Sequence, residues 1–328
     1  MTITTDAPDA DRDRSAARAA ALWPAELRML AAEEAVRHAL ALDDDPETAA
    51  PRHLARERRG ELAVHGVLLA AWIARRHAAQ GSRARVVGLN GGQGSGKSTL
   101  SALTRAALAR VFDLRAVVLS IDDLYLTRAE RAALASEVHP LLATRGVPGT
   151  HDVVLGERLL DALTGPAAEP VAVPRFDKAV DDRAPESAWD RVPAPVDVVL
   201  FEGWCVGASA QGAEALTAPC NRLEAEEDAA GRWRRFVDAQ LAGPYAALFA
   251  RLDALVMLRV PDFEAVRRWR GEQEAQLRAE HGGGMDDAAI ARFVAHYERV
   301  TRHQLATLPS RADLCFDLDA DHAIVAVG

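Results

Sequence analysis

Residues 91–99 read Gly91-Gly92-Gln93-Gly94-Ser95-Gly96-Lys97-Ser98-Thr99 and fit Gly-x-x-x-x-Gly-Lys-Ser/Thr, the pattern of a phosphate-binding loop. Only glycine lets a backbone wrap an anion closely enough to present several N–H groups to it. A helix that follows such a loop points its positive N-terminal end at the same phosphates. We therefore expect these nine residues to bind a nucleoside triphosphate. Lys97 would reach the β- and γ-phosphates, and Ser98 would ligate Mg²⁺.

The sequence around this loop has the order that the motif requires. An apolar run typical of a buried strand precedes the loop, and residues 100–108 carry apolar side chains at helical spacing. Strand-like runs occur at 85–90, 115–121, 196–201, 254–260 and 313–318, with helical segments between most of them. This alternation predicts an α/β P-loop NTPase fold, in which a parallel sheet has helices on both faces and binds ligands at the carboxyl ends of its strands.

The chain has 328 residues, enough for one large α/β domain or two small ones. We expect residues 1–20, which are polar and acidic, to form a disordered tail. Residues 21–82 are expected to form a helical N-terminal extension, with one helix from Trp23 to about Leu42 and another from about His53 to Ala79. Residues 83–328 then form the P-loop domain.

Composition restricts the possible partners. The net charge of −9 argues against binding to nucleic acid or to a membrane surface, so we expect a small-molecule substrate. The first fifteen residues lack the apolar region of a signal peptide, and the longest apolar run, 62–74, is too short to span a bilayer. The three cysteines form no CxxC pair, which favours a reduced, cytoplasmic protein. The sequence leaves the oligomeric state open.

Carboxylates follow two of the predicted strands. Asp122 and Asp123 stand at the end of the run 116–121, where a carboxylate can accept a proton from an attacking hydroxyl or hold Mg²⁺ through water. An aspartate at such a position can also be a helix N-cap. Glu202 ends the run 196–201 in the Walker-B pattern, which predicts a contact with Mg²⁺ or its water; the alternative is a surface glutamate at a strand end. We expect Lys97, Asp122 and Glu202 to be the catalytic residues.

Further segments give the chain a family resemblance. They are Asp122-Asp123-Leu124-Tyr125-Leu126-Thr127, Arg145-Gly146-Val147-Pro148-Gly149-Thr150-His151-Asp152, Pro174-Arg175-Phe176-Asp177-Lys178 and Phe201-Glu202-Gly203-Trp204, in that order. In these segments the chain resembles the plant-type D-glycerate 3-kinases and their bacterial relatives, which belong with uridine kinase, phosphoribulokinase and pantothenate kinase. The resemblance covers residues 83 to 318 and makes 83–328 a P-loop kinase domain.

The resemblance implies an ATP-dependent transfer of phosphate to the 3-hydroxyl of D-glycerate, with Asp122 as the base. The chain departs from the family pattern at Val147-Pro148, where Asn-Ala or a similar pair is expected. A kinase for another small hydroxy acid, a sugar or a nucleoside is therefore an alternative. A regulatory or transport-coupled ATPase is an alternative of another class, and a nucleotide-binding module without turnover is a third.

The acceptor site is expected in the loops that follow the second strand. An acceptor that bears a carboxylate needs a cation, which arginine supplies in bidentate form. The residues assigned to substrate binding are Asp123, Tyr125, Arg145, His151, Arg175 and Lys178. A structural role is the alternative for His151, and Asp152 is a candidate cap for a helix that begins near Val153.

A lid is expected near residues 262–285. Arg267 and Arg270 are three residues apart on a helical segment, and such arginines can close over the phosphates of ATP. The alternative is a solvated helix in which Arg270 pairs with Glu274. Gly282-Gly283-Gly284 would supply the flexible break that a moving lid needs.

Overall fold

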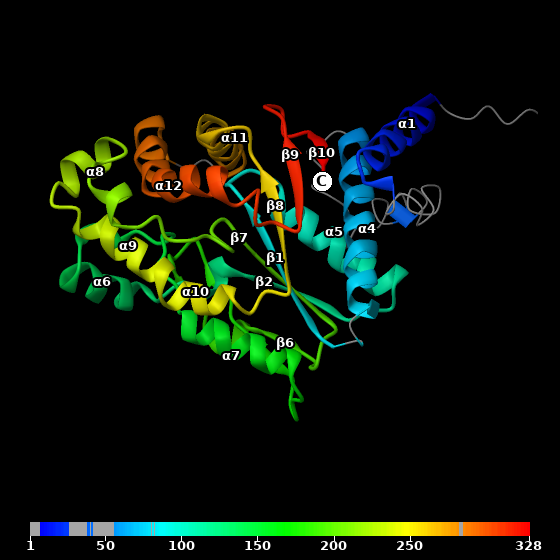
Figure 1. The fold of residues 1–328 in the computed structure, drawn as a ribbon, viewed down its shortest axis with the longest axis horizontal. Helices are drawn as coiled ribbons and strands as arrows, with labels where there is room; N and C mark the ends of the chain where they lie inside the picture. Colours follow the sequence, from blue (N-terminus) through cyan, green and yellow to red (C-terminus); the bar gives the residue numbers. More distant parts are fainter. Residues whose placement is uncertain are drawn as a thin grey trace, which may run out of the picture.

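The computed structural model describes residues 7–25, 38, 39, 41, 56–79, 81, 83–281 and 285–328. Its centre is a six-stranded sheet in the order β10-β9-β8-β1-β7-β2 (Figure 1), with parallel pairing throughout except that β10 runs antiparallel to β9. The strands are β1 (Arg85–Gly91), β2 (Ala116–Ser120), β7 (Val198–Gly203), β8 (Ala254–Arg259), β9 (Leu314–Leu318) and β10 (Ile324–Val327). The five predicted strands are all present, and β10 is an addition at the edge.

The helices cover both faces of this sheet, as the alternation of elements predicts. Each face of the sheet has its own hydrophobic core, and neighbouring residues of β7 belong to different cores. Leu200 packs on the side of α4 (Arg56–Ala79) and α5 (Lys97–Val111), whereas Phe201 packs on the side of α7 (Val153–Thr164) and α10 (Pro244–Phe249). Figure 1 shows these two pairs of helices on opposite sides of the sheet. Because both faces are covered, the central strands read as continuous apolar runs.

The remaining helices lie around this framework. They are α1 (Ala7–Ala21), α6 (Arg128–Glu137), α8 (Arg222–Glu227), α9 (Arg232–Ala242), α11 (Phe263–His281) and α12 (Asp287–Thr307), with 3₁₀ turns η1 (Ile121–Leu124), η2 (Pro140–Ala143), η3 (Glu186–Ala188) and η4 (Ala213–Leu216).

The N-terminal extension packs against the P-loop domain through α4, which confirms the helix expected up to Ala79. The expectation of a disordered tail over residues 1–20 is wrong for residues 7–20, which belong to α1. Ala16, Ala19 and Ala20 recur at helical spacing and are buried, so this helix has an apolar face that sequence polarity concealed. The helix expected from Trp23 to Leu42 lies largely outside the described residues.

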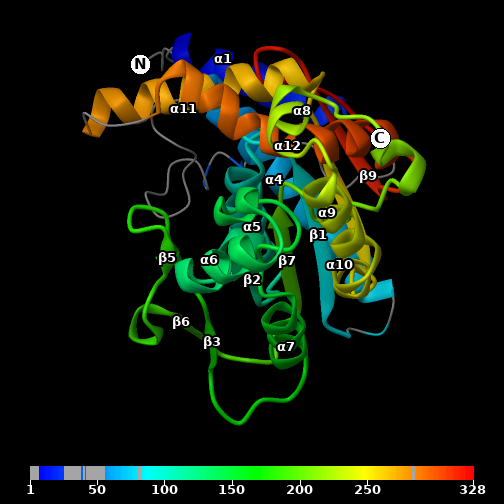
Figure 2. The ribbon, with the colours of Figure 1, turned by 90° about the vertical axis from the view of Figure 1, so that its left-hand side faces the viewer.

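Two small antiparallel pairs stand apart from the central sheet (Figure 2), and the sequence did not predict them. β3 (Val171–Val173) pairs with β6 (Asp190–Val192), and β4 (Phe176–Asp177) pairs with β5 (Asp182–Arg183). They are two or three residues long and too short to show a periodicity. The β4–β5 hairpin carries Lys178 in its turn, which becomes important at the site.

In the part of the chain that the structure describes, no helix has the length and apolarity needed to cross a membrane. The three cysteines are unpaired.

Candidate active site

The phosphate-binding loop connects β1 to α5 at the carboxyl edge of the sheet. Gly94 and Gly96 have φ angles of 79° and 83°, a region that residues with a Cβ atom rarely adopt. No side chain caps the N-terminus of α5, so its first N–H groups are left for a ligand. The loop therefore has the strand–loop–helix geometry of an anion site.

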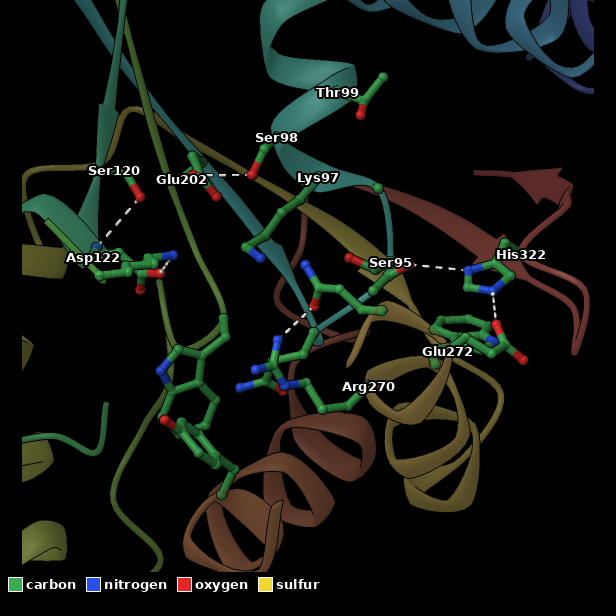
Figure 3. A pocket seen from close by; sticks show the side chains of 18 of the residues that line it. Ser95, Lys97, Ser98, Thr99, Ser120, Asp122, Glu202, Arg270, Glu272 and His322 are labelled. Atoms are coloured by element: carbon green, nitrogen blue, oxygen red, sulfur yellow. Dashed lines mark hydrogen bonds and ion pairs between the residues drawn. The ribbon is translucent and has the colours of Figure 1, made fainter. Parts of the chain in front are cut away.

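A cleft of about 750 Å³ opens over this loop (Figure 3), within the size range of small-molecule sites. Residues 93–99 of the loop line it. Gly91 lies within β1, and neither Gly91 nor Gly92 lines the cleft. These two residues, which were predicted to bind the nucleotide, therefore do not face it in the cleft. The cleft extends from Asp122 at one end to His322 at the other, with Lys97 between them in Figure 3.

Glu202 and Ser98 stand together where a magnesium ion would be expected. Glu202 is the penultimate residue of β7, and its Oε1 accepts a hydrogen bond of 3.3 Å from Ser98 Oγ. Its Oε2 is buried without a hydrogen-bond partner, and Glu202 is one of the residues that line the cleft. The described residues contain no cluster of three or more His, Cys, Asp or Glu that would form a protein-only metal cage. A hydroxyl, one carboxylate and phosphate oxygens suit Mg²⁺, which keeps several waters.

Asp122 lies at the end of β2, in the 3₁₀ turn η1, and reaches the cleft. Its Oδ1 accepts a hydrogen bond of 2.8 Å from the Tyr125 hydroxyl, and its Oδ2 accepts one of 2.8 Å from Lys178 Nζ. Burial alone would raise the pKa of Asp122, but the nearby ammonium groups of Lys178 and Lys97 outweigh it and lower the pKa to about 2. The carboxylate is therefore ionised and able to accept a proton.

Asp123 has different partners from Asp122 and does not line the cleft. It accepts hydrogen bonds from Arg175 Nη1 (2.7 Å) and from the backbone N–H of Phe176 (3.0 Å), and none of these residues lines the cleft. Burial raises the pKa of Asp123, in opposition to these two donors. The structure thus does not bring Asp123 or Arg175 to the acceptor site as predicted. Their contact ties the β4–β5 hairpin to the end of β2.

His151 is buried beneath the site rather than in it. Its ring stacks on Tyr125 at 4.7 Å, and its Nδ1 lies 2.6 Å from the Tyr245 hydroxyl. Burial lowers its pKa to about 4, so the ring is neutral near pH 7. Its Nε2 has no partner, yet the residue does not line the cleft. The alternative of a structural role fits this placement, and Asp152 caps α7 as expected.

Arg145 and Lys178 do line the cleft, as predicted, together with Tyr125. Arg145 pairs with Asp181 of the β4–β5 turn, and its backbone carbonyl accepts a hydrogen bond of 3.1 Å from Tyr297. Trp204 and Tyr297 form an aromatic wall with ring centroids 4.8 Å apart. This wall was missed because Tyr297 comes from α12, far along the chain from any motif.

The two arginines of the expected lid are in different surroundings. Arg270 lines the cleft, pairs with Glu274 and lies over the ring of Phe293 at 5.2 Å. Arg267 is exposed, pairs with Glu264 at 3.7 Å and does not line the cleft. The structure therefore places only Arg270 where it would meet a bound ligand. The Gly282–Gly284 break lies outside the described residues.

Comparisons with known proteins agree with this geometry. No protein-family model matches the chain. An uncharacterized kinase of Schizosaccharomyces pombe, mug58, is 34% identical over 252 residues, which cover 72% of this chain and 87% of the relative. The chloroplastic D-glycerate 3-kinase of Arabidopsis thaliana is 32% identical over 252 residues, or 72% of this chain and 53% of that enzyme. A solved D-glycerate 3-kinase from Cryptococcus neoformans var. grubii superposes with a TM-score of 0.67 at 25% identity and covers 81% of this chain and 98% of its own.

The sheet order, the phosphate loop and these relatives define a P-loop kinase, an enzyme that transfers phosphate from ATP to an alcohol group. Within that class, the chain belongs to the same family as mug58, and it is similar to the D-glycerate 3-kinases of Arabidopsis and Cryptococcus. The expected family, fold class and enzyme class are confirmed.

Proposed function

We propose that this protein transfers the γ-phosphate of MgATP to the 3-hydroxyl of D-glycerate. The observation that carries the proposal is the acceptor end of the cleft, where the Asp122 carboxylate is paired with Lys178 and where Arg145 also lines the cleft. A hydroxy acid needs both a base for its hydroxyl and a cation for its carboxylate. The names of the Arabidopsis and Cryptococcus relatives support glycerate as the acid.

The proposed mechanism uses groups that already stand in the cleft. Asp122 accepts the proton of the acceptor hydroxyl while that oxygen forms a bond to the γ-phosphorus. The bond between the γ-phosphorus and the β–γ bridging oxygen breaks, leaving ADP and 3-phosphoglycerate. Lys97 stabilises the negative charge on the β- and γ-phosphate oxygens as that bond breaks. Mg²⁺, held by Ser98 and through Glu202, supplies further charge neutralisation when it is bound.

The departure from the family pattern at Val147-Pro148 does not argue for a larger acceptor. Both residues are buried and neither lines the cleft. Val147 packs in the core on the α7 side of the sheet. A change at these two positions therefore affects how the loop packs rather than which groups an acceptor meets.

The test is ADP release measured with and without D-glycerate, together with ³¹P NMR of the product. We expect D-glycerate to stimulate ADP release by several orders of magnitude and the new ester to lie on the 3-oxygen. Equal rates with and without any acceptor would indicate an ATPase instead. Greater stimulation by another hydroxy acid, a sugar or a nucleoside, tested in the same panel, would replace glycerate as the acceptor.

A further inference from the structure

The end of the cleft opposite Asp122 has no role in the acceptor chemistry. Three segments that are distant in sequence meet there: α4 of the N-terminal extension, α11, and the turn between β9 and β10. The side chains that line this end are Arg58, Leu62, Trp269, Glu272, Asp321 and His322. Figure 3 shows His322 and Glu272 beyond Ser95, on the far side of Lys97 from Asp122.

His322 is held in a fixed orientation at this end. Its ring stacks on Trp269 with centroids 4.1 Å apart and planes 21° from parallel. Nδ1 lies 3.0 Å from the carbonyl oxygen of Gly94 in the phosphate loop, and Nε2 lies 3.1 Å from Oε2 of Glu272. One face of the ring is therefore covered by Trp269. The side chain is one-third exposed and lines the cleft, so the ring keeps surface that a ligand can contact.

The turn that carries His322 is anchored from both sides. The Arg58 guanidinium donates a hydrogen bond of 3.1 Å to the carbonyl of Asp321, and Trp269 Nε1 donates one of 3.1 Å to the carbonyl of Ala320. His322 itself has φ 63°, a left-handed conformation uncommon for residues other than glycine and asparagine. These contacts hold the aromatic surface in place before any ligand binds, which lowers the cost of binding.

The direction of a bound triphosphate follows from the two ends of the cleft. Its γ-phosphate must lie between Lys97 and Asp122 for transfer to an acceptor, so the nucleoside leaves the loop on the other side. That side offers a stacked aromatic pair and the apolar side chain of Leu62. Aromatic surfaces bind nucleobases through stacking, to which a guanidinium can add.

We propose that the base of the nucleoside triphosphate stacks on the face of His322 that Trp269 does not cover, with Arg58 and Leu62 of α4 forming the opposite wall. This inference rests on the proposed use of MgATP at the phosphate loop. It gives the N-terminal extension a part in nucleotide binding, and it makes the β9–β10 turn both a support of the phosphate loop and the platform for the base.

The experiment compares two probes by calorimetry on the full chain: ATP, and inorganic tripolyphosphate, which carries the phosphates without a base. The variants are His322→Asn, which tolerates the left-handed backbone and keeps a side-chain amide able to reach Gly94, and Arg58→Ala. Arg75→Ala, at an exposed position of the same α4, is the matched control. Melting temperatures of all proteins check the fold.

We expect His322→Asn to weaken ATP binding by about 5- to 140-fold, since stacking of one base contributes about 1–3 kcal/mol. Arg58→Ala is expected to weaken it in the same direction, and Arg75→Ala is expected to leave it unchanged. Binding of tripolyphosphate should be the same in all variants.

Equal weakening of both probes would overturn the inference, because His322 would then only support the loop. Unchanged ATP binding in both variants would also overturn it. Failure of the unmodified protein to bind ATP would instead contradict the proposed function.

Discussion

Lys178 Nζ lies 2.8 Å from Oδ2 of Asp122, so the proposed base is held by a cation before any acceptor is bound. The other carboxylate oxygen, Oδ1, accepts a hydrogen bond from the Tyr125 hydroxyl, also at 2.8 Å. A carboxylate oxygen has two lone pairs, so an acceptor hydroxyl can bind Asp122 beside these donors or in place of one of them. Tyr125 is buried, whereas the Lys178 side chain is 61% exposed in the β4–β5 turn, so Lys178 is the donor that is free to move. We expect it to turn to the acceptor carboxylate when the hydroxyl takes its place.

This pairing predicts a pH dependence. In the unmodified protein the pKa of Asp122 is about 2, so kcat/KM should show no acid limb from this group above about pH 4. Lys178→Met removes a cation and leaves the burial that raises the pKa of Asp122. Because Asp122 is protonated below its pKa and can then no longer act as a base, the acid limb of kcat/KM should move to higher pH. Lys178→Arg keeps the charge and serves as the control. A Met variant with the unmodified profile would show that Lys178 does not set the charge of Asp122.

The second prediction separates the two neighbouring aspartates. Asp122→Asn keeps size and hydrogen bonding but cannot accept a proton, so kcat should fall by about 10²- to 10⁴-fold with MgATP affinity nearly unchanged. Asp123→Asn should retain most of kcat and lower the melting temperature, because Asp123 holds Arg175 and the backbone of Phe176. For both variants, stopped kinetic assays measure kcat and nucleotide titration measures the affinity for MgATP. An inactive Asp123→Asn beside an active Asp122→Asn would mean that the base is the other carboxylate.

Much of the framework could be predicted because its signals are local. Strand, glycine loop and helix follow one another along the chain, and a carboxylate at the end of a buried strand must lie at the ligand edge of the sheet. Asp122 and Glu202 were located in this way. Their proposed roles stay predictions until the variants are measured.

What could not be predicted depends on contacts between distant segments. No property of Asp123 alone indicates that it turns toward Arg175, 52 residues away, rather than into the cleft. His151 and its partner Tyr245 are 94 residues apart. His322 lies in a turn before an edge strand too short to show a pattern, and its link to Gly94 spans 228 residues. Such pairings come from tertiary packing, which the order of residues along one element does not reveal.

Lys97 gives the third prediction. Lys97→Ala should reduce kcat by about a hundredfold or more, because it removes a cation that stabilises the transferring phosphate. The fold should be unaffected, because Lys97 is the first residue of α5, lines the cleft, and is replaced by a residue of high helix propensity; circular dichroism and thermal unfolding check this. A variant with the kcat of the unmodified protein would contradict the assignment of the loop as the catalytic phosphate site, and with it the proposed kinase mechanism.

The last prediction distinguishes a ligand contact from a solvated helix in α11. Arg270 lines the cleft beside Phe293, whereas Arg267 is exposed and paired with Glu264. If Arg270 acts on the reacting phosphate, Arg270→Ala should lower kcat with a smaller change in the dissociation constant of ATP, because the interaction is strongest in the transition state. Arg267→Ala should have the smaller effect on kcat.

Arg270→Ala also leaves the buried Glu274 without its cation, so a loss of stability must be separated from a loss of catalysis. Arg270→Lys, which keeps the charge next to Glu274 but loses the planar guanidinium, provides that separation. A fall in kcat in Arg270→Lys with an unchanged melting temperature supports a role at the phosphate. If both Arg270 variants keep full kcat and only lose stability, Arg270 is part of the α11 packing and this helix does not act on the reaction.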